Sequence, residues 1–214
     1  MKIPSLPRFS LWMIPAILGA LLLVAWLWSR GPTTSIFLAG SYPSAIAIDG
    51  AGNVWVANAG GNNVSELSPT GALVGTFAVR SDHWGIAIDG AGNVWVTNQN
   101  SGNVSELSPT GALLGTYTVG SLPSAIAIDG AGNVWVAKEG SNGNVLELSP
   151  TGALLGTFAV GSRPFGIAID GAGDVWVVNM GHRTIGTAAG DSNVSELIGT
   201  GASPVKTPLL LQPK

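Results

Sequence analysis

Few of the side chains that could transfer protons lie outside the repeated segments of this chain. The two histidines, His83 and His182, both stand in segments that differ between otherwise similar stretches of sequence. The acids of the same variable segments are Asp82, Glu139 and Asp191. A general base must lie within hydrogen-bond reach of its substrate, and spacing this loose defines no such pair. We therefore assign no catalytic residue and interpret both histidines as surface loop residues.

The composition excludes several kinds of function. The chain has 214 residues and no cysteine, so it can form no disulfide, no thiolate metal site and no thiol nucleophile. Beyond residue 30 there are 6 Lys and Arg against 12 Asp and Glu. This acidic balance argues against nucleic acid as a partner and against docking on anionic lipid.

Most of the chain consists of four similar units of about 40 residues. SAIAIDGAGNVWVA is spelled twice, from Ser44 and from Ser124, and close variants begin at Gly85 and Gly166. Gly, Asn and Pro turns divide the second unit into four short apolar stretches, which are 85–89, 94–98, 104–108 and 112–119. Four short antiparallel strands per unit predict a propeller blade. We place the units near residues 41–80, 81–120, 121–161 and 162–200.

Three repeated residue types have a predicted structural role. The carboxylate of Asp89 can accept backbone N–H groups in the turn that follows it, and one carboxylate per turn is too few for calcium. We expect Trp95 to pack onto an alanine-bearing face of the neighbouring blade. The third-strand acids are expected on the solvated outer part of the disc: Glu66, Glu106, Glu147 and Glu196.

The units PSAIAIDGAGNVWVAN and GNVSELSPTG resemble NHL-type repeats, and they are especially similar to the streptogramin (virginiamycin B) lyase-like propellers of bacteria. The resemblance covers Ser41 to about Leu197 and implies an all-β, NHL-like β-propeller. NHL propellers usually have six blades and the lyases seven, whereas this sequence has about four four-stranded blades.

The resemblance also implies an enzymatic alternative. Streptogramin lyases eliminate across a lactone with a His and Glu/His set and Mg²⁺. Here His83 stands one residue before the position where such enzymes tend to carry a histidine, so no catalytic residue is carried over. We expect no cofactor and no metal site, with Mg²⁺ only if the lyase alternative holds.

The N-terminal part of the repeat region is expected to close the ring. Residues 34–41, TSIFLAGS, resemble the fourth strands of the units, and the last unit lacks that strand. This segment would then form an outer clasp strand in a small closed ring, or a second chain would complete the ring. An open arc would instead leave two apolar blade faces in water, and a homo-oligomer is expected in that case.

Residues 11–28, LWMIPAILGALLLVAWLW, form an uncharged run long enough to cross a bilayer. The run has interfacial tryptophans and no small-x-small site, which favours an uncleaved transmembrane signal anchor over a cleaved, secreted form. Positive charge before the run places residues 1–10 in the cytoplasm and the propeller, 34–200, in the periplasm or outside the cell. Residues 29–33 are a linker and residues 201–214 a C-terminal tail.

The four units differ mainly on one face of the predicted disc. The turns DGAGN and SPTG barely vary, whereas the segments before the first strand and the loops after the second strand hold nearly all the differences. A ligand would bind on this variable face, unless its loops have simply drifted. The candidate binding residues there are Tyr42, His83, Trp84, Asn98, Lys138, Phe165, His182 and Arg183.

These observations predict a membrane-anchored, extracytoplasmic β-propeller that acts as a non-catalytic binding module. Its partners would be the membrane, through the N-terminal helix, and a small-molecule, glycan or protein ligand. A lyase or lactone-acting enzyme that works from the same face is one alternative. A purely structural repeat protein is the other.

Overall fold

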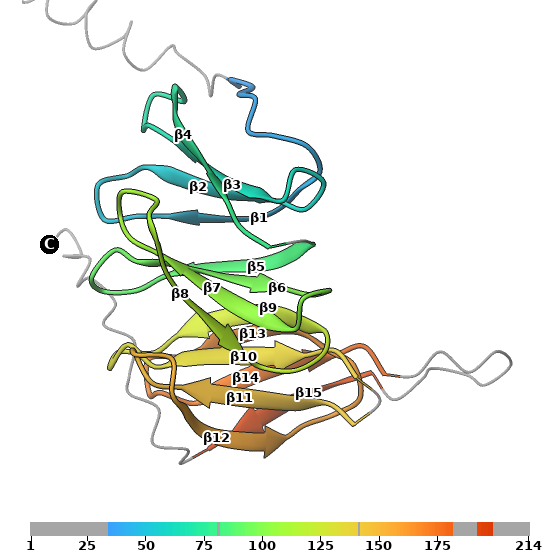
Figure 1. The fold of residues 1–214 in the computed structure, drawn as a ribbon. Helices are drawn as coiled ribbons and strands as arrows, with labels where there is room; N and C mark the ends of the chain where they lie inside the picture. The colour runs from blue at the N-terminus through green and yellow to red at the C-terminus, as the bar shows by residue number, and fades with distance from the viewer. Residues whose placement is uncertain (1–33, 81, 141, 182–191, 199–214) are drawn as a thin grey trace, which may run out of the picture. The chain divides into compact units, whose positions relative to one another are not determined.

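The computed structural model describes residues 34–80, 82–140, 142–181 and 192–198. In these residues the chain is all-β, with four antiparallel sheets that follow one another in sequence (Figure 1). The predicted transmembrane helix 11–28, like residues 1–10, the linker 29–33 and the tail 201–214, lies outside them. Within the described part of the chain, no helix is both long enough and apolar enough to cross a membrane.

Each sheet is a meander whose strands pair in chain order, and we call the sheets blades 1 to 4. Blade 1 contains β1 (Pro43–Ile48), β2 (Val54–Asn58), β3 (Asn63–Leu67) and β4 (Leu73–Ala78). Blade 2 contains β5 (His83–Ile88), β6 (Val94–Asn98), β7 (Asn103–Leu107) and β8 (Leu113–Thr118). Blade 3 contains β9 (Pro123–Ile128), β10 (Val134–Lys138), β11 (Asn144–Leu148) and β12 (Leu154–Ala159). Blade 4 contains β13 (Pro164–Ile169), β14 (Val175–Asn179) and β15 (Asn193–Leu197).

The repeated Asp fixes both the first turn of a blade and the tryptophan of that blade. In blade 2, Oδ1 of Asp89 accepts hydrogen bonds from the backbone N–H groups of Ala91 (2.9 Å) and Asn93 (2.8 Å). Its Oδ2 accepts one from the indole N–H of Trp95 (3.0 Å), and the equivalent bonds in the other blades measure 3.2, 3.4 and 3.1 Å. These bonds confirm the predicted turn-forming role of the Asp, and the bond to tryptophan adds a second role.

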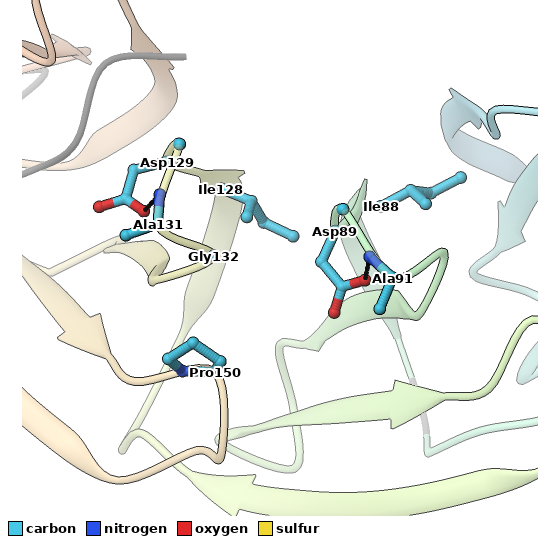
Figure 2. Close-up of a pocket in the computed structure, with 10 residues that line it drawn as sticks. Ile88, Asp89, Ala91, Ile128, Asp129, Ala131, Gly132 and Pro150 are labelled. Carbon is cyan, nitrogen blue, oxygen red and sulfur yellow. Dashed lines mark hydrogen bonds between the residues drawn. The ribbon is translucent and has the colours of Figure 1, made fainter. Parts of the chain in front are cut away.

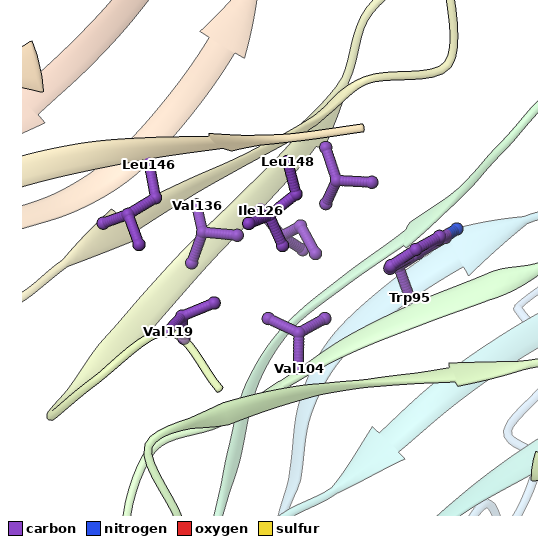
Figure 3. Close-up of a cluster of buried hydrophobic side chains, with 8 residues drawn as sticks. Trp95, Val104, Val119, Ile126, Val136, Leu146 and Leu148 are labelled. Carbon is purple, nitrogen blue, oxygen red and sulfur yellow. The ribbon is translucent and has the colours of Figure 1, made fainter. Parts of the chain in front are cut away.

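Consecutive blades are joined by clusters of buried apolar side chains. Trp95 of blade 2 is fully buried in a cluster with Ile126, Val136 and Leu148 of blade 3 (Figure 3). Ala87 lies beside Trp95 rather than opposite it, because the two residues are register partners on β5 and β6 and such partners share a face. The prediction of an alanine-bearing receiving face is therefore wrong. The tryptophans of blades 1 to 3, which are Trp55, Trp95 and Trp135, each pack onto the Ile and Val face of the next blade.

The third-strand acid of blade 2 is covered by the fourth strand of the same blade. Glu106 is 6% exposed, and its carboxylate accepts hydrogen bonds from Asn93 Nδ2 (3.1 Å) and from the Tyr117 hydroxyl (2.8 Å). The Tyr117 ring stacks on Trp95 with 5.4 Å between ring centroids. The prediction of a solvated acid is therefore wrong here, because an aromatic side chain from β8 lies over it.

Burial of this acid depends on the fourth strand being present. Glu66 and Glu147 are also buried, and desolvation, with a smaller contribution from the charges of Asp49 and Asp129, raises the pKa of both. In blade 4, where β15 is the last strand within the described residues, Glu196 is exposed as predicted. The same blade leaves its tryptophan, Trp176, 39% exposed, whereas the other three repeated tryptophans are fully buried.

The predicted clasp is not formed in the described residues. Residues 34–40 contain no strand, and the sheet of blade 4 has three strands there. The carbonyl of Ala39 instead accepts hydrogen bonds from Asn58 Nδ2 (3.4 Å) and from the Ser65 hydroxyl, so this part of the segment is held against blade 1. Closure of the ring by strand 34–41 within one chain is therefore not observed.

Candidate ligand-binding site

The segment that leads into each blade has the same unusual backbone. The residue before the first strand has a positive φ in all four blades, and these residues are Tyr42 (50°), Asp82 (63°), Leu122 (57°) and Arg163 (55°). Side chains other than glycine seldom adopt this conformation. In each blade a hydrogen bond holds it, because the carbonyl of that residue accepts the N–H of the residue just after the second strand, at 2.8–3.0 Å. No sequence pattern predicts this geometry, since Tyr, Asp, Leu and Arg share no property that favours a positive φ.

This geometry brings aromatic side chains from three blades to one hollow, which we call the aromatic hollow. It has a volume of about 390 Å³ and is lined by Tyr42, Pro43, Ser44, Ala59, Trp84, Ser124 and Phe165. Trp84 of blade 2 and Phe165 of blade 4 meet edge to face, with 5.8 Å between ring centroids. The three aromatic residues proposed from the sequence therefore gather at one place, although they are far apart along the chain.

The aromatic hollow suits a neutral, apolar group. Among the described residues that line it, none carries a charge. Its two serine hydroxyls are already engaged, because Ser44 donates to His83 O (2.6 Å) and Ser124 donates to Pro164 O (2.9 Å). Tyr42, Trp84 and Phe165 are 80%, 40% and 41% exposed, so their rings remain open to a ligand.

Two of the predicted polar residues lie inside blade 2 rather than on this surface. His83 and Asn98 are both fully buried, and His83 Nδ1 lies 2.8 Å from Asn98 Oδ1. Burial lowers the pKa of His83, against smaller opposing effects of the bond to Asn98 and the charge of Asp82. Direct contact of either side chain with a ligand is excluded in this conformation, and His83 has no route to act as a base on a bound molecule.

The remaining predicted residues are not brought to the aromatic hollow. Lys138 is half-buried and lines a separate hollow of about 270 Å³, together with Glu139. Glu139 forms an ion pair with Arg163 of blade 4, with 2.6 Å between Arg163 Nη2 and Glu139 Oε1. His182 and Arg183 lie outside the described residues, so their role as binding residues stays a prediction.

A larger hollow, of about 630 Å³, lies at the invariant turns between blades 2 and 3 (Figure 2). It contains Asp89 and Asp129, but both carboxylates already accept hydrogen bonds from their own turns, including those from Ala91 and Ala131 (2.9 Å each). These acids serve the framework of the blades, and we do not assign the hollow as the ligand site. The described part of the chain contains no group of three or more His, Asp or Glu side chains placed to hold a metal ion.

Comparison with known proteins bears on the fold. No protein-family model and no curated protein matches the sequence. Solved structures do match, among them hydrazine synthase from Kuenenia stuttgartiensis, with a TM-score of 0.66 at 19% identity over 79% of this chain and 49% of that one. A streptogramin B lyase matches with a TM-score of 0.59 at 21% identity over 76% of this chain and 54% of that one. Virginiamycin B lyase from Staphylococcus aureus matches with a TM-score of 0.60 at 20% identity over 77% and 58%.

These matches define the class of the fold. The chain has a β-propeller fold like that of the streptogramin lyases, which confirms the resemblance seen in the repeats. It spans about half the length of these solved structures. At identities near one fifth the likeness concerns the fold alone and carries no activity over to this chain.

Proposed function

We propose that this chain is a membrane-anchored, extracytoplasmic propeller that binds, without catalysis, a neutral ligand group with an apolar surface. The observation that supports this proposal is the aromatic hollow, to which Tyr42, Trp84 and Phe165 come from three different blades. Concave sites lined by aromatic side chains with few polar groups are typical of ligand binding. The ligand group would be the ring or aliphatic part of a small molecule, a sugar face or a peptide side chain.

The anchoring part of the proposal rests on the run 11–28, with the N-terminus in the cytoplasm. Because the chain has no cysteine, single cysteines report its topology without interference. In intact cells, a membrane-impermeant maleimide should label Leu114→Cys, on an exposed strand, and should not label Ser5→Cys. The opposite labelling pattern, or a soluble chain that lacks residues 1–28, would contradict the anchored topology.

Ligand binding is tested with a panel of neutral aromatic compounds, oligosaccharides and short aromatic peptides. A compound present at one hundred times its Kd should raise the free energy of unfolding by about 2.7 kcal/mol. Trp84→Ala and Phe165→Ala should abolish this gain, whereas the control Leu154→Ala, on an exposed outer strand, should keep it. A panel that stabilises nothing, or stabilises all variants equally, would favour the purely structural alternative.

The lyase alternative calls for a separate assay. The full chain is incubated with a streptogramin B antibiotic and Mg²⁺, and linearisation is followed by mass spectrometry. We expect no turnover above background, because His83 is fully buried and bonded to Asn98. Turnover that is lost in His83→Ala or His182→Ala would overturn the non-catalytic proposal.

A further inference from the structure

The two terminal blades expose faces that the inner blades bury. On blade 4, Trp176 is 39% and Val194 is 59% exposed, whereas the equivalent Trp95 and Val104 of blade 2 are both fully buried. Trp95 and Val104 are buried because blade 3 covers them. The tryptophan face of blade 4 thus has the composition of an interface and no blade upon it within the described residues.

Blade 1 exposes the opposite face. Ile46 and Ile48 of β1 are 65% and 67% exposed. The equivalent of Ile46 in blade 3 is Ile126, which is 8% exposed because it packs against blade 2. Inside the chain, each interface between blades pairs a tryptophan face with an isoleucine face. Blade 4 exposes the tryptophan face of such an interface, and blade 1 exposes the isoleucine face.

We propose that these two faces join two copies of this chain head to tail, so that blade 4 of each copy packs against blade 1 of the other. The occupant follows from the interfaces inside the chain, which pair a tryptophan face with an isoleucine face at all three blade junctions. A second copy carries both faces. A contact that joins two different faces is heterologous. Such contacts add copies without limit unless the copies close into a ring.

Two copies give a closed ring of eight blades, which lies within the usual range of four to eight. The chain aligns with about half of each solved structure it resembles, such as 49% of the hydrazine synthase chain and 54% of the streptogramin B lyase, so the aligned parts of two copies have about the length of one such chain. A two-fold axis along the axis of the ring also leaves both N-terminal segments on the same side, as insertion into one membrane requires.

The ring would also supply a fourth strand for blade 4, which has three strands within the described residues. Residues 35–40, SIFLAG, align with 75–80, GTFAVR, so Phe37 corresponds to Phe77. Phe77 stacks on Trp55 with 5.5 Å between ring centroids. Ile36 and Phe37 are 90% and 50% exposed. In the ring, this segment of one copy adds to β15 of the other, and Phe37 covers the partner's tryptophan at position 176 as Phe77 covers Trp55.

Cysteine cross-linking tests the pairing of faces, because the natural chain has no cysteine. Val178 corresponds to Thr97, whose hydroxyl donates to Ser124 O (3.0 Å) two residues before Ile126. Ile46→Cys and Val178→Cys should therefore lie close together across the junction. Both positions are at least half exposed, at 65% and 50%, so neither change should disturb folding.

The full chain in detergent is treated with a short bismaleimide. A mixture of the two single variants should give covalent dimers, the double variant should stop at dimers, and each single variant alone should stay monomeric. The control variants Leu114→Cys and Leu155→Cys, both 55% exposed on outer strands, should give no dimer when mixed. A cross-linked monomer of the double variant, a ladder of larger species, or no dimer in the mixture would overturn the proposal.

Mass in solution provides a second test that needs no cross-linker. Wild type should have the mass of two chains, and Ile48→Lys, which puts a charge into the junction, should weaken association at least about tenfold. Both proteins keep residues 11–28, so association through the hydrophobic run would leave the variant dimeric. A dimeric Ile48→Lys or a monomeric wild type would contradict the ring.

Discussion

The Nδ1 atom of His83 lies 2.8 Å from Oδ1 of Asn98, and both side chains are fully buried. Asn98 uses its Nδ2 to donate to Asn103 Oδ1 (2.7 Å) and Ser105 Oγ (2.9 Å), so its Oδ1 is the acceptor and His83 carries a proton on Nδ1. The other ring nitrogen, Nε2, is buried without a hydrogen-bond partner in the structure. Blade 2 therefore holds a neutral histidine in its interior.

Stability should depend on the charge state of His83. Burial lowers its pKa below the ordinary value of 6.5, so between the two values the unfolded chain binds more protons than the folded chain. The contribution of neutral His83 to the free energy of unfolding should therefore be at its full value above pH 6.5 and should fall as the pH drops below 6.5. Urea unfolding at a series of pH values measures this slope.

The matched control is His83→Gln, which keeps an amide donor for Asn98 but does not titrate. The difference in unfolding free energy between wild type and His83→Gln should shrink as the pH falls below 6.5. Taking the difference removes the carboxyl groups that titrate at lower pH in both proteins. A difference that stays constant with pH would show that His83 is not buried in its neutral form.

Tyr117 should ionise late in an alkaline titration. Burial, the hydrogen bond to Glu106 and the charge of Glu106 together raise the pKa of Tyr117 from 10.0 to about 12. The folded chain thus retains a proton that the unfolded chain loses, and the free energy of unfolding should fall as the pH rises from 10.0 to about 12.

The chain has two tyrosines, so one substitution isolates this titration. The ultraviolet absorbance of tyrosinate should show a step at about 12 in wild type, and Tyr117→Phe should lack it. Phenylalanine occupies the same position in blades 1 and 3, as Phe77 and Phe158, so the variant should keep its stack on the tryptophan. The same late step in Tyr117→Phe would contradict the assignment.

Trp95 should be among the most costly side chains to remove. It is fully buried, stacks on Tyr117 and donates to Asp89, so Trp95→Ala should lower the free energy of unfolding by about 3–5 kcal/mol. Trp84→Ala is the control, because Trp84 is 40% exposed and meets one aromatic ring edge to face. Its removal should therefore lower the free energy of unfolding clearly less than the removal of Trp95. Equal losses in the two variants, measured by urea unfolding, would contradict the packing described for blades 2 and 3.

The fold could be predicted well from the sequence, because the same pattern of strands and turns occurs in four units. Asp89, Gly90 and Trp95 have their counterparts at nearly constant spacing, and local turn chemistry was enough to place the strands. The face on which Trp95 packs was predicted wrongly, because residue types do not show which side of a strand meets the neighbouring blade. Strand register settles that question, since Ala87 and Trp95 are partners across two strands.

The candidate site was only partly predictable. The sequence singled out Tyr42, Trp84 and Phe165 because they stand where the units differ. That they line one hollow depends on positive-φ backbone conformations, which the residue types at those positions do not predict. His83 was chosen on the same ground, but its side chain turns into the blade and bonds to Asn98. The sequence alone does not show that His83 has a hydrogen-bond partner fifteen residues away along the chain.

Adding a side chain at Gly111 should lower the free energy of unfolding, although this glycine lies in a surface turn. Its φ is +80°, and a Cβ atom there would lie 2.0 Å from Cε1 of Phe77, the ring that covers the tryptophan of blade 1. The turn of blade 2 therefore closes over the aromatic stack of blade 1. Gly111→Ala should cost about 2–4 kcal/mol of unfolding free energy, from the strained backbone and the clash together.

Gly90→Ala is the matched control, since nothing lies within 4 Å of the added atom and its φ is not positive. It should change the free energy of unfolding by less than about 1 kcal/mol. Urea unfolding of both variants measures the contrast, and a Gly111→Ala protein as stable as wild type would show that the turn does not pack against Phe77.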